Sequence, residues 1–148
     1  MNRARLVADI MTREVAVLQE EDNVEDILQQ MYQLQLRHVP VVDGARLVGL
    51  ISHHDMLRFT VNELLVDVQS PRTREEYLQE LNENTFVARV MTRELVTVTP
   101  ETPIAEAAEL LFRTKIGCLP VVQDDRLVGI VTETDFLGLL VRLLKAQT

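Results

Sequence analysis

The stretch HVPVVDGARLVGLISHHD, residues 38–55, returns as CLPVVQDDRLVGIVTETD at residues 118–135. The two copies keep an offset of 80 residues at every position, and the match extends without a gap to residues 7–57 and 87–137. Two similar units that cannot each close a core alone are expected to pack together. The repeat therefore predicts two like folds with a cleft between their similar faces.

Each copy is predicted to fold as β-α-β-β-α after a short lead-in helix, at residues 5–10 in the first copy. β-branched runs that are polar only at a turn predict strands. These are expected at residues 15–18, 39–42 and 46–51, and at residues 95–98, 119–122 and 126–131. Apolar spacing of i, i+3, i+4, i+7 predicts one helix in each copy, with the faces Val24, Ile27, Leu28 and Met31, and Ile104, Ala107, Ala108 and Leu111. A second helix is expected at residues 53–66 and 133–146, so the fold class is α/β of the α+β type.

Three segments follow from the repeat. The first repeat with its lead-in helix takes residues 1–66, an acidic helical connector takes 67–86, and the second repeat takes 87–148. Residues 60–86 hold six acidic and two basic side chains, a balance of −4, which is half of the net charge of −8. A solvated helix is expected at residues 72–81, and it serves either as an extra packed helix or as a partner contact.

Composition limits the classes of function. The 148 residues are 47% hydrophobic and 26% charged, as in ordinary soluble globular proteins. No apolar run approaches the ~18 residues that span a bilayer, and the apolar start is too short for a signal peptide. A net charge of −8 argues against a nucleic-acid partner, which needs a basic footprint. With a single cysteine and no internal disulfide, the expected location is the cytoplasm.

The helix expected at residues 133–146 is apolar around too much of its circumference for one core to cover. Such an excess favours a partner surface, most simply in a homodimer. The alternative is a terminal helix that folds back over its own sheet.

Three motifs, each present twice, carry a specific family resemblance. They are a hydrophobic-Met-Thr lead-in, a hydrophobic-Pro-Val-Val strand, and a Gly-hydrophobic-hydrophobic-Ser/Thr-x-x-Asp segment. With them the chain resembles a tandem pair of CBS domains, a Bateman module of the stand-alone bacterial type, over residues 7–145. The resemblance implies two units packed about a pseudo-twofold axis through their sheets, and often a disc-like dimer. It also implies that AMP, ADP or ATP, or else S-adenosylmethionine or NAD, binds in the clefts between the units.

Ser52 and Asp55, with their equivalents Thr132 and Asp135, lie at predicted strand-to-helix junctions. A hydroxyl followed three residues later by an acid is a capping box, and that role alone explains the pattern. Both copies use the short Asp, however, and its two oxygens can accept hydrogen bonds from a ribose cis-diol. The resemblance implies that role for Asp55 and Asp135, with Ser52 and Thr132 beside them at sugar or phosphate.

An acid at the helix start repels phosphate, so a nucleotide needs cations elsewhere. The family often supplies them just before the Pro-containing strand, where the first repeat has Arg37-His38 and the second has Gly117-Cys118. Arg37 can make a forked contact to phosphate and His38 a pH-sensitive one, whereas Gly117-Cys118 offers only backbone. Two equivalent phosphate sites are therefore not expected.

Further contacts are expected around these positions. The backbones that can hold an adenine edge belong to Val39, Pro40, Leu119 and Pro120, with the side chains of Val41 and Val121 nearby. Arg13, Arg93 and Lys115 are either supporting cations or solvated surface charges.

Neither a metal site nor a redox thiol is favoured by the histidines and the cysteine near these motifs. The adjacent His53 and His54 point about 100° apart on a helix, so they do not easily share one ion, and the second repeat has Glu133 and Thr134 there. Cys118 has no base or helix start near it in sequence and is expected to be a small, half-buried cysteine.

The sequence is thus interpreted as a non-catalytic sensor of adenine nucleotides that acts by population shift and signals to an unidentified effector protein. One alternative is a dimerisation scaffold with empty clefts. Another is a small enzyme such as a nucleotide hydrolase.

Overall fold

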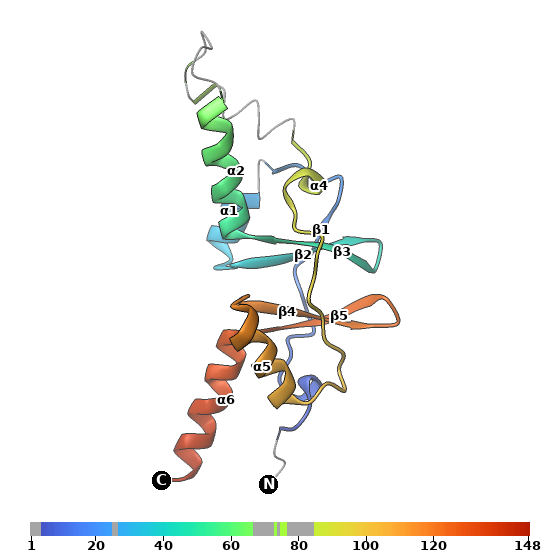
Figure 1. Ribbon diagram of the computed structural model, residues 1–148, viewed down its shortest axis with the longest axis vertical. Helices are drawn as coiled ribbons and strands as arrows, with labels where there is room; N and C mark the ends of the chain where they lie inside the picture. The colour runs from blue at the N-terminus through green and yellow to red at the C-terminus, as the bar shows by residue number, and fades with distance from the viewer. Residues whose placement is uncertain (1–3, 25–26, 67–72, 74, 77–84) are drawn as a thin grey trace. The chain divides into compact units, whose positions relative to one another are not determined.

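The structure is a computed structural model that describes residues 4–24, 27–66, 73, 75–76 and 85–148. It divides into two compact units, each built from both halves of the sequence. The β2–β3 unit contains residues 16–44 and 48–95, and the β4–β5 unit contains residues 1–15, 45–47 and 96–148. Figure 1 shows the elements of both along the chain.

The β2–β3 unit holds three strands and three helices among its described residues. They are β1 (Leu18–Gln19), α1 (Ile27–Gln33), β2 (His38–Asp43), β3 (Arg46–Ser52), α2 (His53–Val66) and α4 (Val87–Val90). The strand order is β1-β2-β3, and β1 pairs in parallel with β2. Helix α2 contacts both α1 and α4. One apolar core fills this unit, from Val24, Ile27, Met31, Val39, Val41, Ile51, Met56, Val87 and Met91.

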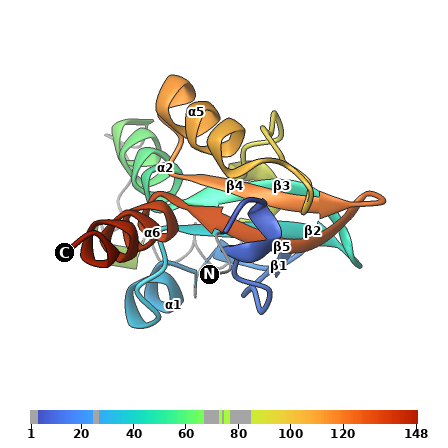
Figure 2. The same ribbon diagram turned by 90° about the horizontal axis from the view of Figure 1, so that it is seen from below.

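The β4–β5 unit repeats the plan in the second half of the chain. Its elements are η1 (Val7–Asp9), α5 (Ile104–Thr114), β4 (Cys118–Gln123), β5 (Arg126–Thr132) and α6 (Glu133–Ala146). Strands β4 and β5 form an antiparallel hairpin, and α5 and α6 both lie on one face of it (Figures 1 and 2). The core consists of Val7, Met11, Val98, Ala107, Leu111, Leu119, Val121 and Val131.

The hairpin turns follow from the residues that occupy them. In the second repeat Asp124 and Asp125 adopt φ values of 50° and 63°, the left-handed pair that a two-residue hairpin requires. In the first repeat Gly44 supplies the positive φ, at 64°. The mixed α+β class, the hairpin strands and the helices at 53–66 and 133–146 are confirmed.

The lead-in segments are exchanged between the two units. Val7 and Met11 come from the first repeat but belong to the core of the β4–β5 unit. Val87 and Met91 come from the second repeat but belong to the core of the β2–β3 unit. The boundaries 1–66 and 87–148 are therefore those of the sequence repeats and not those of the compact units.

Backbone bonds hold each exchanged segment in its unit. Thr12 and Ile130 bond to each other through both backbone N–H groups, each at 2.9 Å. Thr92 and Leu50 do the same, at 2.8 and 3.0 Å. Each lead-in thus adds one antiparallel bridge beside the third strand of the other repeat.

A glycine in each repeat makes room for the incoming methionine. A Cβ on Gly129 would lie 2.9 Å from Met11 Sδ and 2.9 Å from the carbonyl oxygen of Thr12. A Cβ on Gly49 would likewise lie 2.9 Å from Met91 Cγ. A larger residue would therefore require a shift of the methionine at Gly49, and of the backbone of Thr12 as well at Gly129. The repeated Gly and the repeated Met-Thr are thus two sides of one contact.

Two predicted strands differ from the observed ones. The first strand is only Leu18–Gln19, and in the second repeat only Val98 forms a bridge, to Val121. Both shorten because residues 5–13 and 85–93 are held by the other unit, so the chain reaches its own sheet later. Most of the helix expected at 72–81 lies outside the described residues. Within the described part of the chain, no helix is long and apolar enough to cross a membrane.

Candidate functional site

Each unit has a hydroxyl–acid cluster at the junction of its last strand and the following helix. In the β2–β3 unit, Ser52 N donates to Asp55 Oδ2 at 2.9 Å, and Asp55 N donates to Ser52 Oγ at 3.0 Å. In the β4–β5 unit, Thr132 donates to Asp135 Oδ2 from its backbone N at 2.8 Å and from its hydroxyl at 3.2 Å. The capping role of both pairs is confirmed.

The residue before each Pro-containing strand adjoins its cluster through the backbone. His53 N, the first amide of α2, donates to the Arg37 carbonyl at 2.9 Å. Glu133 N, the first amide of α6, donates to the Gly117 carbonyl at 3.2 Å. Arg37 therefore lies near Asp55, and Gly117 lies near Asp135, as the sequence predicted.

A threonine from the exchanged lead-in joins the first cluster, and it is not among the site residues predicted from the sequence. The hydroxyl of Thr92 donates to Asp55 Oδ2, although the two residues are 37 positions apart and the distance is a long 3.5 Å. Thr12, its equivalent, is held against Ile130, two residues before Thr132. The repeated Met-Thr motif is visible in the sequence. The sequence pattern does not indicate, however, that each motif packs in the unit formed mainly by the other repeat.

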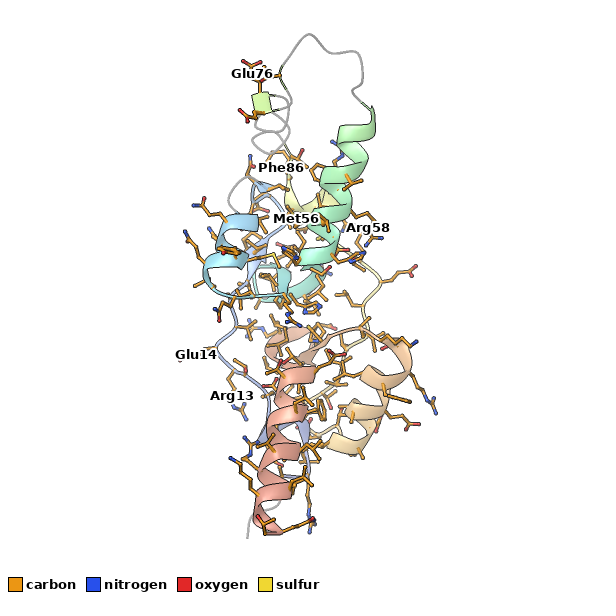
Figure 3. The ribbon with its side chains drawn as sticks, turned by 90° about the vertical axis from the view of Figure 1, so that its left-hand side faces the viewer. Arg13, Glu14, Met56, Arg58, Glu76 and Phe86 are labelled. Atoms are coloured by element: carbon orange, nitrogen blue, oxygen red, sulfur yellow. The ribbon has the colours of Figure 1, made fainter. Side chains whose placement is uncertain are left out.

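The two carboxylates differ in their second oxygen. Asp55 Oδ1 accepts a bond from Arg58 Nη2 at 2.8 Å, and the side chain of Asp55 is only 11% exposed whereas that of Arg58 is 61% exposed. Figure 3 labels Arg58 on α2. The position equivalent to Arg58 is Gly138 on α6. Among the described residues, Asp135 accepts bonds only from Thr132 and only through Oδ2.

Cys118 lies directly beside the second cluster. It pairs with Thr132 across β4 and β5 and is 1% exposed. Burial, and to a smaller extent the charge of Asp135, raises the pKa of the Cys118 thiol to about 12. The thiol therefore stays protonated at neutral pH, which does not suit a redox nucleophile. The cysteine is more deeply buried than the half-buried state expected from the sequence.

The expected adenine contacts are core residues. Val39, Pro40, Leu119 and Pro120 are all buried, and Val41 and Val121 are 0% exposed. Any contact from these positions to a ligand therefore comes from the backbone, because their side chains already fill the two cores.

The three candidate cations, Arg13, Arg93 and Lys115, lie in different local surroundings. Arg13 and Arg93 each donate to a carbonyl of the preceding lead-in helix, Ala8 and Ala88 respectively, at 3.3 Å. Arg93 also lies 3.9 Å from Glu20. Lys115 is the exposed, left-handed C-cap of α5 with φ 56°.

Metal binding finds no support in the described part of the chain. Its residues contain no group of three or more His, Cys, Asp and Glu side chains that could hold an ion. His53 and His54 are both exposed at the start of α2.

Known proteins resemble this chain over most of its length. The family model described as CBS domain matches twice, at residues 7–62 and 87–142. The structure of AcuB from Vibrio cholerae superposes with a TM-score of 0.78 at 33% identity and covers 96% of this chain and 94% of its own. CBSX2, crystallised in complex with AMP, gives 0.76 at 28% identity, over 95% of this chain and 98% of its own.

A third solved structure, the CBS domain pair of protein MJ0100, contains 5′-methylthioadenosine and S-adenosyl-L-methionine. It gives a TM-score of 0.67 at 26% identity and covers 91% of this chain and 98% of its own. Some curated relatives are much longer. The chain spans 42% of one from Methanocaldococcus jannaschii and 24% of one from Methanohalobium evestigatum, at 26% and 29% identity.

Proposed function

Because this chain belongs to the CBS-domain family and carries the domain twice, we propose that it is a regulatory module that binds adenosine-containing ligands at its two hydroxyl–acid clusters. The observation that carries the proposal is that in each unit the lead-in of one repeat pairs with the strand that ends at the hydroxyl–acid cluster of the other repeat, and that Thr92 reaches Asp55 in this way. The ligands in the structures of CBSX2 and MJ0100, which are AMP, 5′-methylthioadenosine and S-adenosyl-L-methionine, share an adenosine group.

The chemistry of the clusters supports ribose recognition. A carboxylate accepts hydrogen bonds from two neighbouring hydroxyls, and charge-assisted bonds of this kind are the stronger ones in proteins. Asp55 and Asp135 are both partly exposed, so their carboxylates remain reachable from solvent. The capping bonds hold each carboxylate in one orientation before the ligand arrives, which lowers the entropy cost of binding.

The exchange of lead-ins provides a regulatory mechanism. A ligand that contacts Asp55 and Thr92 binds to the first repeat and to the lead-in of the second at once, and so stabilises the docked lead-in. Such a ligand shifts an equilibrium only by its differential affinity for the two states. A complete switch needs a difference of ~5.5 kcal/mol, and smaller differences give graded control.

We propose that the module has no catalytic activity of its own and that an effector protein responds to its state. The described clusters pair each acid with hydroxyls and backbone amides, an arrangement that binds a sugar without activating a nucleophile. Incubation with ATP and Mg²⁺ tests this, because turnover would contradict it. The cytoplasmic location stays a prediction.

Helix α6 supports the further proposal of a homodimer. Leu137, Leu140, Val141 and Leu144 follow the i, i+3, i+4, i+7 spacing of one face and are 48–61% exposed. An exposed apolar stripe of this kind is typical of an interface between chains. Leu140→Glu should therefore give a monomer in sedimentation velocity, and a monomeric unaltered protein would contradict the proposal.

Thermal shift followed by calorimetry tests ligand binding. A ligand at 100 times its Kd stabilises the folded state by ~2.7 kcal/mol, so AMP, ATP, 5′-methylthioadenosine and S-adenosylmethionine are compared at equal concentration. Asp55→Asn and Asp135→Asn keep the caps but remove the charge. The loss of a charge-assisted contact costs ~1.5–3 kcal/mol, or roughly 10- to 150-fold in affinity.

Asp9→Asn is the matched control for these variants. Asp9 also accepts backbone bonds at a helix start, from Arg5 N at 2.8 Å and Leu6 N at 2.9 Å. Its loss should leave binding unchanged. If all three variants bind the ligands equally well, Asp55 and Asp135 act only as helix caps. If the unaltered protein binds none of the four compounds, the dimerisation scaffold is favoured.

A further inference from the structure

The two clusters differ in charge at equivalent positions. Arg37 and Arg58 of the β2–β3 unit correspond to Gly117 and Gly138 of the β4–β5 unit, and the exposed His53 corresponds to the exposed Glu133. With its aspartate and two arginines, the first cluster has a formal charge of +1. The second, with Asp135 and Glu133, has a formal charge of −2.

The first cluster also contains an ion pair, between Arg58 and Asp55, that the second cluster lacks among the described residues. The guanidinium lies 2.8 Å from Asp55 Oδ1, while Oδ2 of the same carboxylate accepts bonds from Ser52 and Thr92. Both oxygens of Asp55 are therefore engaged, and a positive charge is held beside them. Because Arg58 is largely exposed, its free N–H groups can meet an anion from solvent.

Asp135 has the opposite surroundings. Its described bonds all come from Thr132 and reach only Oδ2. Its charge also helps to raise the pKa of the Cys118 thiol, so a buried neutral group, not a cation, occupies the place beside it. The position of Arg58 is taken by Gly138, which brings no charge.

We propose that the two sites select different classes of adenosine compound, and the proposal rests on the function proposed above. The Asp55 site takes phosphate-bearing adenosines, because Arg58 and Arg37 compensate a phosphate that carries about −1.5 to −2 charges at neutral pH. The Asp135 site takes uncharged or cationic adenosines, because Glu133 and Asp135 are both acidic and, among the described residues, Asp135 has no arginine ion pair like that between Arg58 and Asp55. Arg58 is the specificity-determining residue of the pair.

AMP and 5′-methylthioadenosine are suitable probes, since they share adenosine and differ in bearing a phosphate or a methylthio group. Calorimetry on Asp135→Asn reports the Asp55 site, and calorimetry on Asp55→Asn reports the Asp135 site. The ratio of the two dissociation constants should favour AMP at the first site and 5′-methylthioadenosine at the second. Both preferences should weaken as salt is raised, because screening acts on exposed charges.

Removing the arginine at position 58 and placing one at the equivalent position 138 tests whether Arg58 determines the selectivity. In the Asp135→Asn background, Arg58→Ala should weaken AMP on the order of tenfold while leaving 5′-methylthioadenosine as tight or tighter. In the Asp55→Asn background, Gly138→Arg should strengthen AMP by a similar factor. The backbone accepts a side chain at this position, because a Cβ on Gly138 would have only Arg142 Nη1 nearby, at 3.9 Å.

Arg113→Ala is the matched control for the loss of a surface ion pair. Arg113 bonds to Glu109 at 2.7 Å on α5, and both side chains are well exposed, so its removal should leave the ratio unchanged. If both sites bind both probes with one ratio, and neither Arg58→Ala nor Gly138→Arg changes it, the selectivity is refuted while the proposed function stands. If neither probe binds in any variant, the proposed function falls and the selectivity with it.

Discussion

The exchange of lead-ins predicts that a substitution in one repeat weakens the core assigned to the other. Met11 is 9% exposed and belongs to the core of the β4–β5 unit. Met11→Ala removes three side-chain atoms, and at ~0.8 kcal/mol for each buried methylene the transfer cost is ~2.4 kcal/mol. The cavity left behind raises the loss to as much as ~4 kcal/mol.

Amide hydrogen exchange locates that loss along the chain. A loss of ~2.4 kcal/mol accelerates exchange through local opening by about 50-fold. In Met11→Ala the faster amides should lie in β4 and β5, although the substitution is in the first repeat. Met31→Ala is the matched control, because Met31 is 2% exposed in the core of the β2–β3 unit. Its faster amides should lie in β2 and β3.

A double-mutant cycle also shows which core Met11 belongs to, and it does so even if the whole chain unfolds in one step. Val131 shares a core with Met11, and Ile51, its equivalent, belongs to the other core. Met11→Ala should couple with Val131→Ala by ~0.5–3 kcal/mol and be additive with Ile51→Ala. Coupling with Ile51 in place of Val131, or faster exchange confined to β2 and β3 in Met11→Ala, would refute the exchange.

Three further predictions concern single positions. Gly129→Ala should cost ~1–3 kcal/mol in urea unfolding, because its Cβ would lie 2.9 Å from the Thr12 carbonyl; an unchanged midpoint would contradict that contact. Gly138→Ala should instead stabilise the protein by ~0.5–1 kcal/mol, since its Cβ would meet only one atom, at 3.9 Å, within helix α6. Because burial raises the pKa of Cys118 from 9.0 to about 12, the folded chain keeps a proton that the unfolded chain loses, so stability should fall above pH 9. The free energy of unfolding should decrease by at most ~1.4 kcal/mol per pH unit from this group. Cys118→Ala should therefore lose less stability between pH 8 and pH 10 than the unaltered protein. An identical pH dependence of the two proteins would contradict the prediction.

Local structure could be predicted from the sequence because the forces that decide it act over a few residues. The helices and the caps at Ser52–Asp55 and Thr132–Asp135 depend on neighbours at most four positions away, and the β4–β5 hairpin pairs residues no more than 14 positions apart. The repeat itself, compared position by position, was enough to indicate the family. It also displayed the difference between Arg37 and Gly117. The Asp55-x-x-Arg58 spacing is present in the sequence too, but the ion pair that it forms is seen only in the structure.

Only the tertiary structure decided where each lead-in goes. Both repeats offer a glycine that accepts a methionine, Gly49 and Gly129, so the pattern alone is equally satisfied by either partner. The choice depends on contacts between residues far apart in the chain, and it brings Thr92 to Asp55 across 37 positions. Periodicity records which face of an element is apolar but not which other element covers it, and for this reason the composition of the two sites became visible only in the folded chain.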